Sequence, residues 1–133
     1  MALFRCIGNR ISTDVITLNY ESGNTSWNAN VYGEASLILT KKISPIEVEL
    51  FAKRTLGTAT WAGSCTTKFK AYNVKTNTWE KLAEVKDSTK TIDVSAIAKN
   101  KFYSRIKIEV GGTSSNGSVN HLGYAKIKKY YVK

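Results

Sequence analysis

The sequence predicts an all-β protein built from antiparallel strands as a sandwich or barrel, and two observations support this prediction. Apolar and charged residues alternate along several short segments, which is the period of a strand with one buried face. Gly, Asn and Ser residues interrupt the chain at intervals of roughly 8–12 residues, a spacing typical of turns between short strands. The chain lacks the long helical segments that would cover a parallel sheet, so an α/β fold is disfavoured.

Size and composition predict a single domain that spans residues 1–133. The chain has 133 residues, of which 42% are hydrophobic, and this is enough to build one core. It contains a single proline and no low-complexity tract, which argues against disorder and against a flexible linker. No apolar run approaches the roughly 20 residues that cross a bilayer, so no membrane span is expected.

The expected strands fall into two groups. The clearest alternation lies in four segments, which place apolar residues on one face and mostly charged residues on the other: 46–50, 67–71, 105–110 and 125–128. Five further segments qualify by β-branched content and bounding turns: 3–7, 15–20, 34–40, 78–85 and 89–94. Near the C-terminus the alternation slips by one residue, and a β-bulge at Lys128 or Lys129 would restore it. The one helical candidate is a short turn at residues 95–99.

The chain is strongly basic, with 20 Lys and Arg against 10 Asp and Glu and a formal net charge of +10. One interpretation is a solvated, lysine-rich surface. The other is an anionic partner, which would be nucleic acid, a cell-wall polymer or an acidic glycan. Because the lysines are spread along the chain rather than clustered with arginines and aromatic residues, the solvated surface is favoured over a nucleic-acid groove.

The N-terminal segment lacks the apolar core and the cleavage site of a secretory signal. We therefore expect synthesis in the cytoplasm without a signal peptide. A role outside the cell would then require lysis or assembly into a larger particle such as a virion.

The residues needed for catalysis are scarce. His121 is the single histidine, so a Ser-His-Asp triad would depend on it and a His-rich zinc centre is excluded. Neither a GxSxG elbow nor a P-loop occurs, and most acidic residues alternate with apolar ones as a solvated strand face would. We therefore expect no enzymatic activity. Cys6 and Cys65 form no CxxC pair, which gives no indication of zinc and favours two buried thiols over a disulfide.

A few residues are candidates for ligand contact. For Trp27 and Trp79 the favoured interpretation is core packing. Trp61 lies among small residues in an expected loop, where core packing and stacking on a sugar ring stay equally open. His121 falls in an expected loop, 118–124, and is interpreted first as an exposed polar residue, with a glycan contact as the alternative. The same two interpretations hold for Arg54, at the end of the strand that begins at residue 46.

The order of four motifs resembles the galactose-binding-like jelly roll of discoidin and coagulation-factor C-type domains, which bacterial carbohydrate-binding modules share. An early turn reads SGNTSW at residues 22–27, and a strand pair reads FKAYNVKTNTWEKL at residues 69–82. A later strand reads YSRIKIEV at residues 103–110, and a last strand reads GYAKIKKYY at residues 123–131. The resemblance covers roughly residues 20–133.

This resemblance implies an antiparallel jelly-roll β-sandwich that binds its ligand through loops at one end. Members of the group bind glycans, phospholipid or protein. By position, the residues expected in or near such loops are Arg54, Trp61, His121 and Tyr124. The group's calcium loop carries an Asp where this chain has Ser22, so we expect no cofactor, and a structural calcium ion stays open as the disfavoured alternative.

Two functional hypotheses follow. The first is a non-catalytic, lectin-like module that recognises a glycan or an anionic cell-wall polymer, as part of a phage virion. The opening residues MALFRC are similar to the start of small tail or accessory proteins of phages and prophages. The alternative is a structural or assembly protein whose partners are other virion subunits or copies of itself. Binding to nucleic acid ranks below both, and catalysis ranks last.

Overall fold

The computed structural model describes residues 10–26, 31–113 and 117–133, and the described residues form strands joined by turns. The strands are β1 Arg10–Ser12, β2 Ile16–Glu21, β3 Thr25–Ser26, β4 Val31–Leu56, β5 Thr66–Asn73, β6 Thr78–Lys86, β7 Thr89–Asp93, β8 Tyr103–Gly112 and β9 Ser118–Val132. None of the described residues is helical. The expected strand 3–7, Trp27 and Cys6 lie outside the described residues.

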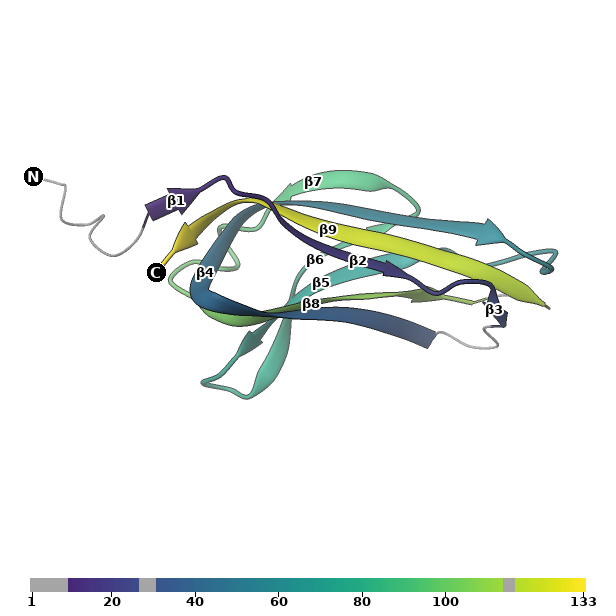
Figure 1. Cartoon of the computed structure of the whole chain (residues 1–133), viewed down its shortest axis with the longest axis horizontal. Coiled ribbons are helices and arrows are strands. Elements are labelled where there is room, and N and C mark those ends of the chain that lie inside the picture. Colours follow the sequence, from purple (N-terminus) through teal and green to yellow (C-terminus); the bar gives the residue numbers. More distant parts are fainter. Residues whose placement is uncertain (1–9, 27–30, 114–116) are drawn as a thin grey trace, which may run out of the picture.

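Two layers are built from one continuous path of antiparallel pairs, because β4 bends and takes part in both (Figure 1). The first half of β4 pairs with β8, which pairs with β5, which pairs with β6. The second half of β4 lies between β9 and β7, and β2 pairs with the other edge of β9.

The strand pairs are nested like the two arms of a long hairpin that has been rolled up. Strand β2 pairs with β9, the two halves of β4 pair with β8 and β7, and β5 pairs with β6. This nesting is the topology of a jelly roll. The prediction of an all-β, antiparallel jelly-roll sandwich is therefore confirmed.

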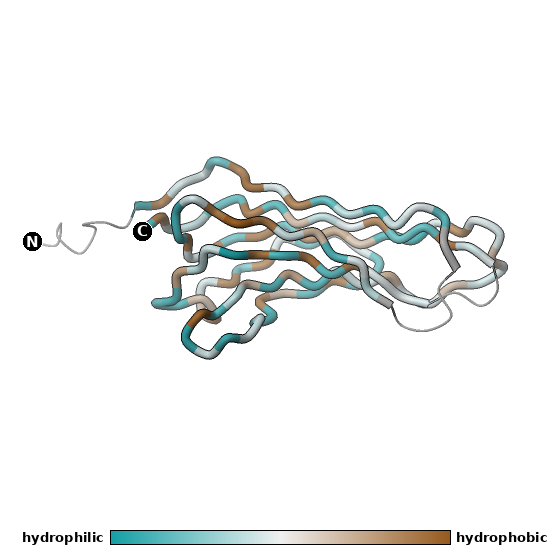
Figure 2. Tube along the Cα trace, turned by 60° about the horizontal axis from the view of Figure 1, so that its bottom comes forward, coloured by the Kyte–Doolittle hydropathy of each residue, from teal (hydrophilic) through white to brown (hydrophobic). Residues whose placement is uncertain are grey.

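The core lies between the two layers and is made of the inward residues that the alternation predicts. Val48 and Leu50 of β4 face Ile106 and Ile108 of β8, and all four side chains are fully buried. Each such side chain contributes about 1.5–3 kcal/mol by leaving water. Figure 2 shows the underlying pattern, with hydrophobic and hydrophilic residues following each other along the strands.

A β-bulge occurs where the alternation slips. Ile127 pairs with Val48 and Lys129 pairs with Glu47, so Lys128 is the extra residue between them. The bulge returns Tyr130 to the buried face. The prediction of a bulge at Lys128 or Lys129 is confirmed.

One core assignment is wrong. Trp79 lies on the outer face of β6 and is only half-buried. Its ring meets Tyr72 edge-on at 5.3 Å, and the charged groups of Arg105 and Lys107 lie over it at 5.3 and 4.4 Å. The strand itself is predicted correctly. The core assignment fails because an aromatic residue that is covered by cations on a sheet surface has the same local sequence pattern as a core residue.

The sandwich has two ends of different construction. The "loop end" carries the connections 57–65 and 87–88, which follow β4 and β6, together with the end of β8 at Gly112 and the start of β9 at Ser118. The "bend end" carries the bend of β4 around residues 39–42, the turn 74–77, the connection 94–102 and the end of β9. In Figure 1 the loop end is on the right and the bend end is on the left.

Candidate ligand-binding site

The structure brings three of the four expected site residues to the loop end. Arg54 lies near the end of β4, Trp61 lies in the connection 57–65, and His121 lies near the start of β9. Arg54 and His121 are directly opposite each other in the β4–β9 pair. Tyr124 does not join them, because its side chain points to the outer face of β9.

Trp61 is exposed and is carried by a connection with fixed backbone contacts. The side chain is 58% exposed. The N–H groups of Gly57 and Ala59 both donate to the carbonyl of Ser118 at 3.0 Å, and the N–H of Gly63 donates to the carbonyl of Thr113 at 2.9 Å. Trp61 therefore presents a large aromatic surface to solvent from an anchored loop.

Arg54 forms an ion pair with Asp87 at the start of the 87–88 turn. The Nη1 and Oδ2 atoms are 3.4 Å apart, and each side chain is 36% exposed. Asp87 is held by Cys65, whose N–H donates to Oδ1 at 2.9 Å and whose carbonyl accepts the Asp87 N–H at 2.9 Å. The ion pair thus presents a carboxylate held by backbone contacts and a half-exposed guanidinium, and the two charges cancel.

An open cavity of about 380 Å³ lies at this pair and is lined by Ala52, Lys53, Arg54, Leu56 and Asp87. It exists because β7 begins at Thr89, opposite Phe51, and leaves the last residues of β4 uncovered on that edge. Cavities of a few hundred Å³ commonly hold small ligands. This cavity at Arg54 and Asp87 has room for a sugar-sized molecule.

The expected loop around His121 is wrong, because this residue lies within strand β9 and its side chain is fully buried. It follows the inward alternation of Val119, Ala125 and Ile127. Burial, and then the nearby cation of Arg54, lower the pKa of His121 below its usual value. A Cβ at Gly112 would lie 2.9 Å from the His121 ring, so the glycine makes room for the imidazole. His121 supports the wall of the loop end from inside.

Tyr124 was also expected near the loops and instead lies on the outer face of the sheet. Its ring stacks on Phe51 with centroids 5.0 Å apart, and its hydroxyl donates to the carboxylate of Glu49. The Nζ of Lys126 lies 4.9 Å from the ring centroid. These contacts fasten Tyr124 to the surface of β4, away from the cavity at Arg54.

Asp87 and Leu56 line the cavity but were not among the expected site residues. Asp87 follows a strand as an ordinary turn residue, and its backbone φ of 49° is one that Asp and Asn adopt more readily than most residues. A turn aspartate of this kind is common in any β protein. The sequence therefore carries no signal that would distinguish Asp87 as a ligand residue.

The early turn that resembles a calcium loop does not offer a carboxylate cluster. The hydroxyl of Ser22 donates to the carbonyl of Gly23 at 2.7 Å and accepts the N–H of His121 at 2.9 Å. Within the described residues no group of three or more His, Cys, Asp or Glu side chains lies close enough together to hold a metal ion. Ser22 thus offers no carboxylate at the position where the group carries its Asp.

Burial raises the pKa of the Cys65 thiol to about 11. Cys65 is a free, buried thiol beside Asp87, so its part in this site is structural. The described residues contain no helix with the length and hydropathy of a membrane span.

The sequence matches no protein family model and no curated protein. Among solved structures, the chain is similar to a mitogen from Yersinia pseudotuberculosis, with 18% identity, a TM-score of 0.46, and 85% of this chain and 86% of that chain covered. It is similar to a family 29 carbohydrate-binding module, with 14% identity, a TM-score of 0.45, and coverage of 92% and 88%. It is also similar to the SPBc2 prophage-derived protein YomS, with 12% identity, a TM-score of 0.38, and coverage of 86% and 96%. At these scores the likenesses assign the chain to no family and no ligand.

Proposed function

We propose that this protein is a non-catalytic carbohydrate-binding β-sandwich whose sugar site lies at the loop end. The observation that carries the proposal is an exposed tryptophan, Trp61, on the end of the sandwich that also holds the open cavity at Arg54 and Asp87. An indole can stack on the apolar face of a sugar ring. A paired guanidinium and carboxylate supply hydrogen-bond donors and acceptors for the hydroxyl groups.

The charge balance of the site favours a neutral glycan. Arg54 and Asp87 compensate each other, and Leu56 adds an apolar wall that is 47% exposed. Lys53, which is exposed, is the remaining charged residue in the cavity lining and leaves it with one net positive charge. A single exposed ammonium group attracts an anion only weakly. We infer that neutral sugar residues, rather than uronic acids or phosphorylated sugars, bind at the loop end.

A glycan array followed by calorimetry tests this proposal. We expect binding to at least one neutral glycan, and we expect Trp61→Ala to weaken it at least tenfold because the stacking surface is lost. Arg54→Ala should weaken it less, since one set of hydrogen bonds is removed. The matched control is Tyr131→Ala, because Tyr131 is an exposed aromatic residue near the bend end and is 41% exposed. The proposal fails if no glycan binds, or if Trp61→Ala binds as well as the Tyr131→Ala protein.

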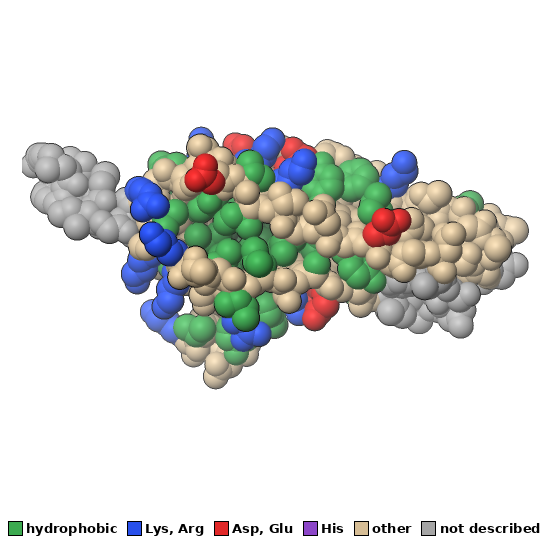
Figure 3. Space-filling view, in the orientation of Figure 1, with side chains coloured by type: hydrophobic (Ala, Val, Ile, Leu, Met, Phe, Trp, Pro, Cys, Tyr) green, Lys and Arg blue, Asp and Glu red, His purple; other side chains and the backbone are tan. Residues whose placement is uncertain are grey.

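A second candidate function is assembly with other subunits, and one surface favours it. A groove of about 200 Å³ lies between the β1–β2 edge and the bend of β4, and it includes Ile16 and Leu39. Ile11 and Ile38 in the same strands are 55% and 77% exposed. Figure 3 shows hydrophobic side chains gathered on this side of the molecule. In a virion, such a surface would pack against neighbouring proteins.

Light scattering separates the two candidates. An assembly protein should show a mass that rises with concentration, and Ile38→Lys should return it to a monomer because it places a charge in the contact. A strict monomer at high concentration, with no partner captured from virion or host proteins, would contradict the assembly function and leave the glycan proposal intact.

A further inference from the structure

A second cavity lies at the bend end and has a very different lining. It has a volume of about 160 Å³, and four of its nine lining residues are lysines: Lys42, Lys75, Lys101 and Lys133. We call this cavity the lysine pocket. The lysines come from the bend of β4, the turn 74–77, the connection 94–102 and the end of the chain. Folding therefore gathers four charges that are spread over residues 42–133 of the sequence, and Figure 3 shows Lys and Arg side chains along this end.

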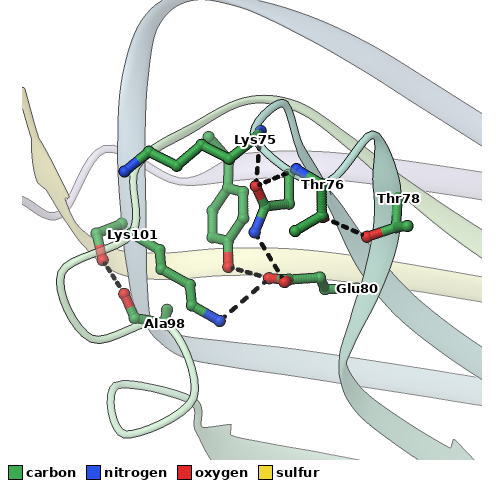
Figure 4. A network of polar contacts seen from close by, with 9 residues as sticks. Lys75, Thr76, Thr78, Glu80, Ala98 and Lys101 are labelled. Carbon is green, nitrogen blue, oxygen red and sulfur yellow. Dashed lines mark hydrogen bonds and ion pairs between the residues drawn. The ribbon is translucent and has the colours of Figure 1, made fainter.

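Polar contacts beside the lysine pocket fix its position (Figure 4). The carboxylate of Glu80 accepts hydrogen bonds from Asn73 at 2.9 Å and from the Tyr103 hydroxyl at 2.8 Å, and Lys101 Nζ lies 3.4 Å from it. The hydrogen bonds from Asn73 and then Tyr103 lower the pKa of Glu80, so the group stays ionised. On the other side, the N–H of Lys133 donates to the carbonyl of Lys42 at 3.0 Å. These contacts hold the residues that line the lysine pocket in place.

The charges of the lysine pocket are poorly compensated. Glu80 pairs with Lys101, whereas Lys42, Lys75 and Lys133 form no ion pair with any described residue. Elsewhere on the sheets Lys70, Lys107 and Lys128 each lie within 3.1 Å of a glutamate. Ammonium groups that share a cavity repel each other, and a bound anion removes that repulsion.

We propose that the lysine pocket binds a tetrahedral oxyanion, a phosphate or sulfate group carried on a small organic ligand. Lysine ammonium groups act as point charges with several donors, which suits such an anion. The ring of Phe102, beneath Lys133 Nζ at 5.5 Å, adds an apolar wall for the organic part. The volume corresponds to roughly five water molecules, enough for the anion and part of a sugar ring. This site is at the opposite end from the proposed glycan site and does not depend on it.

Titration of the full chain with glucose 6-phosphate, glycerol phosphate and inorganic phosphate, followed by NMR and calorimetry, tests the proposal. We expect saturable binding with shifts at Asn73 and Lys101, and no such shifts with glucose. Lys75→Gln combined with Lys133→Gln should weaken binding at least tenfold. The matched control combines Lys86→Gln with Lys90→Gln, which removes the same charge from exposed residues outside the pocket lining. A comparison of glycerol phosphate with poly(glycerol phosphate) shows whether the group comes from a free molecule or a polymer.

Glu80→Gln provides a test in the opposite direction. It removes the Glu80 side-chain carboxylate that is bonded to the pocket lining and releases Lys101, so phosphate should bind several-fold more tightly. A variant that merely disturbed the structure would not strengthen binding. The proposal is overturned if no saturable shifts occur, or if a Glu80→Gln protein that keeps the native amide NMR spectrum binds phosphate more weakly. It is also overturned if the control pair weakens binding as much as the pocket pair, because the attraction would then be diffuse, as for a nucleic acid on a basic surface.

Discussion

The two ends of this jelly roll differ in how their polar groups are satisfied. At the loop end, one exposed ion pair, Arg54–Asp87, lines a cavity together with Leu56, and the exposed Trp61 lies in a connection at the same end. At the bend end, one carboxylate, Glu80, is tied by three partners and faces an excess of ammonium groups. The formal net charge of +10 is therefore unevenly distributed, between a loop-end cavity whose lining has one net positive charge and a bend-end pocket lined by four lysines. Different ligand chemistry is expected at each.

The largest effect on stability is expected at the bend end, from Glu80→Gln. The glutamine cannot accept both hydrogen bonds from Asn73 and Tyr103 while facing Lys101, so one partner is left unsatisfied. Loss of such a partner costs about 1–3 kcal/mol. Urea denaturation measures the change.

Glu84→Gln is the control for Glu80→Gln, because Glu84, at a side-chain exposure of 32%, forms a surface ion pair with Lys81. A pair of that kind contributes about 0–1 kcal/mol. Equal midpoints of urea unfolding for the two variants would show that the Glu80 contacts are no more than a surface ion pair. The polar contacts of the bend end would then be no stronger than the exposed ion pair of the loop end.

The strands were predictable because each layer has one buried face. Residues 46–50 and 105–110 alternate without interruption, and both became inward-facing core strands. The slip in the alternation before Tyr130 also located the bulge. Without an extra residue Tyr130 would point to the outer face of β9, and the bulge at Lys128 turns its side chain inward. Periodicity therefore fixed the elements and most of the core.

The functional residues were less predictable, because a site depends on which loops meet. The residues around His121 are typical of a loop. In the structure, however, His121 is an even number of residues from Ala125 and Ile127, so its side chain points to the same buried face. Extending the alternation of the strand 125–128 back toward the N-terminus would have predicted a buried His121. No such signal joins Arg54 to Asp87, or Lys42 to Lys133, since their proximity arises from the rolled topology alone.

An intermediate effect is expected at the loop end, from the titration of His121. Its pKa in the folded protein lies below the ordinary value of 6.5, so the unfolded chain takes up the proton first as pH falls. The free energy of unfolding should therefore fall below about pH 6.5, by at most about 1.4 kcal/mol per pH unit. Glu80, whose lowered pKa starts from 4.5, contributes a loss only at more acid pH.

Urea midpoints measured between about pH 7 and pH 5 resolve this loss, because a single histidine titrates in that range. The control is His121→Asn, which has no titrating group there and should show a flat profile at its own, lower stability. If the natural protein is equally flat, the buried imidazole is not what makes the loop end sensitive to acid. Its role as an internal support would need another test.

The smallest effect on stability is expected from Asp87→Asn, which separates the turn from the ion pair. Asn tolerates the backbone φ of 49° and its side-chain oxygen still accepts the N–H of Cys65, so the turn is retained. The lost pair with Arg54 is exposed and contributes less than about 1 kcal/mol. Thermal unfolding should therefore change little, while neutral-glycan affinity falls several-fold because a charged acceptor is replaced by a weaker one. Asp87→Ala, which loses the Cys65 contact as well, should be clearly less stable. If Asp87→Asn is as unstable as Asp87→Ala, the ion pair with Arg54, rather than the hydrogen bond from Cys65, stabilises the turn. Charge interactions would then stabilise the loop end as they do the bend end.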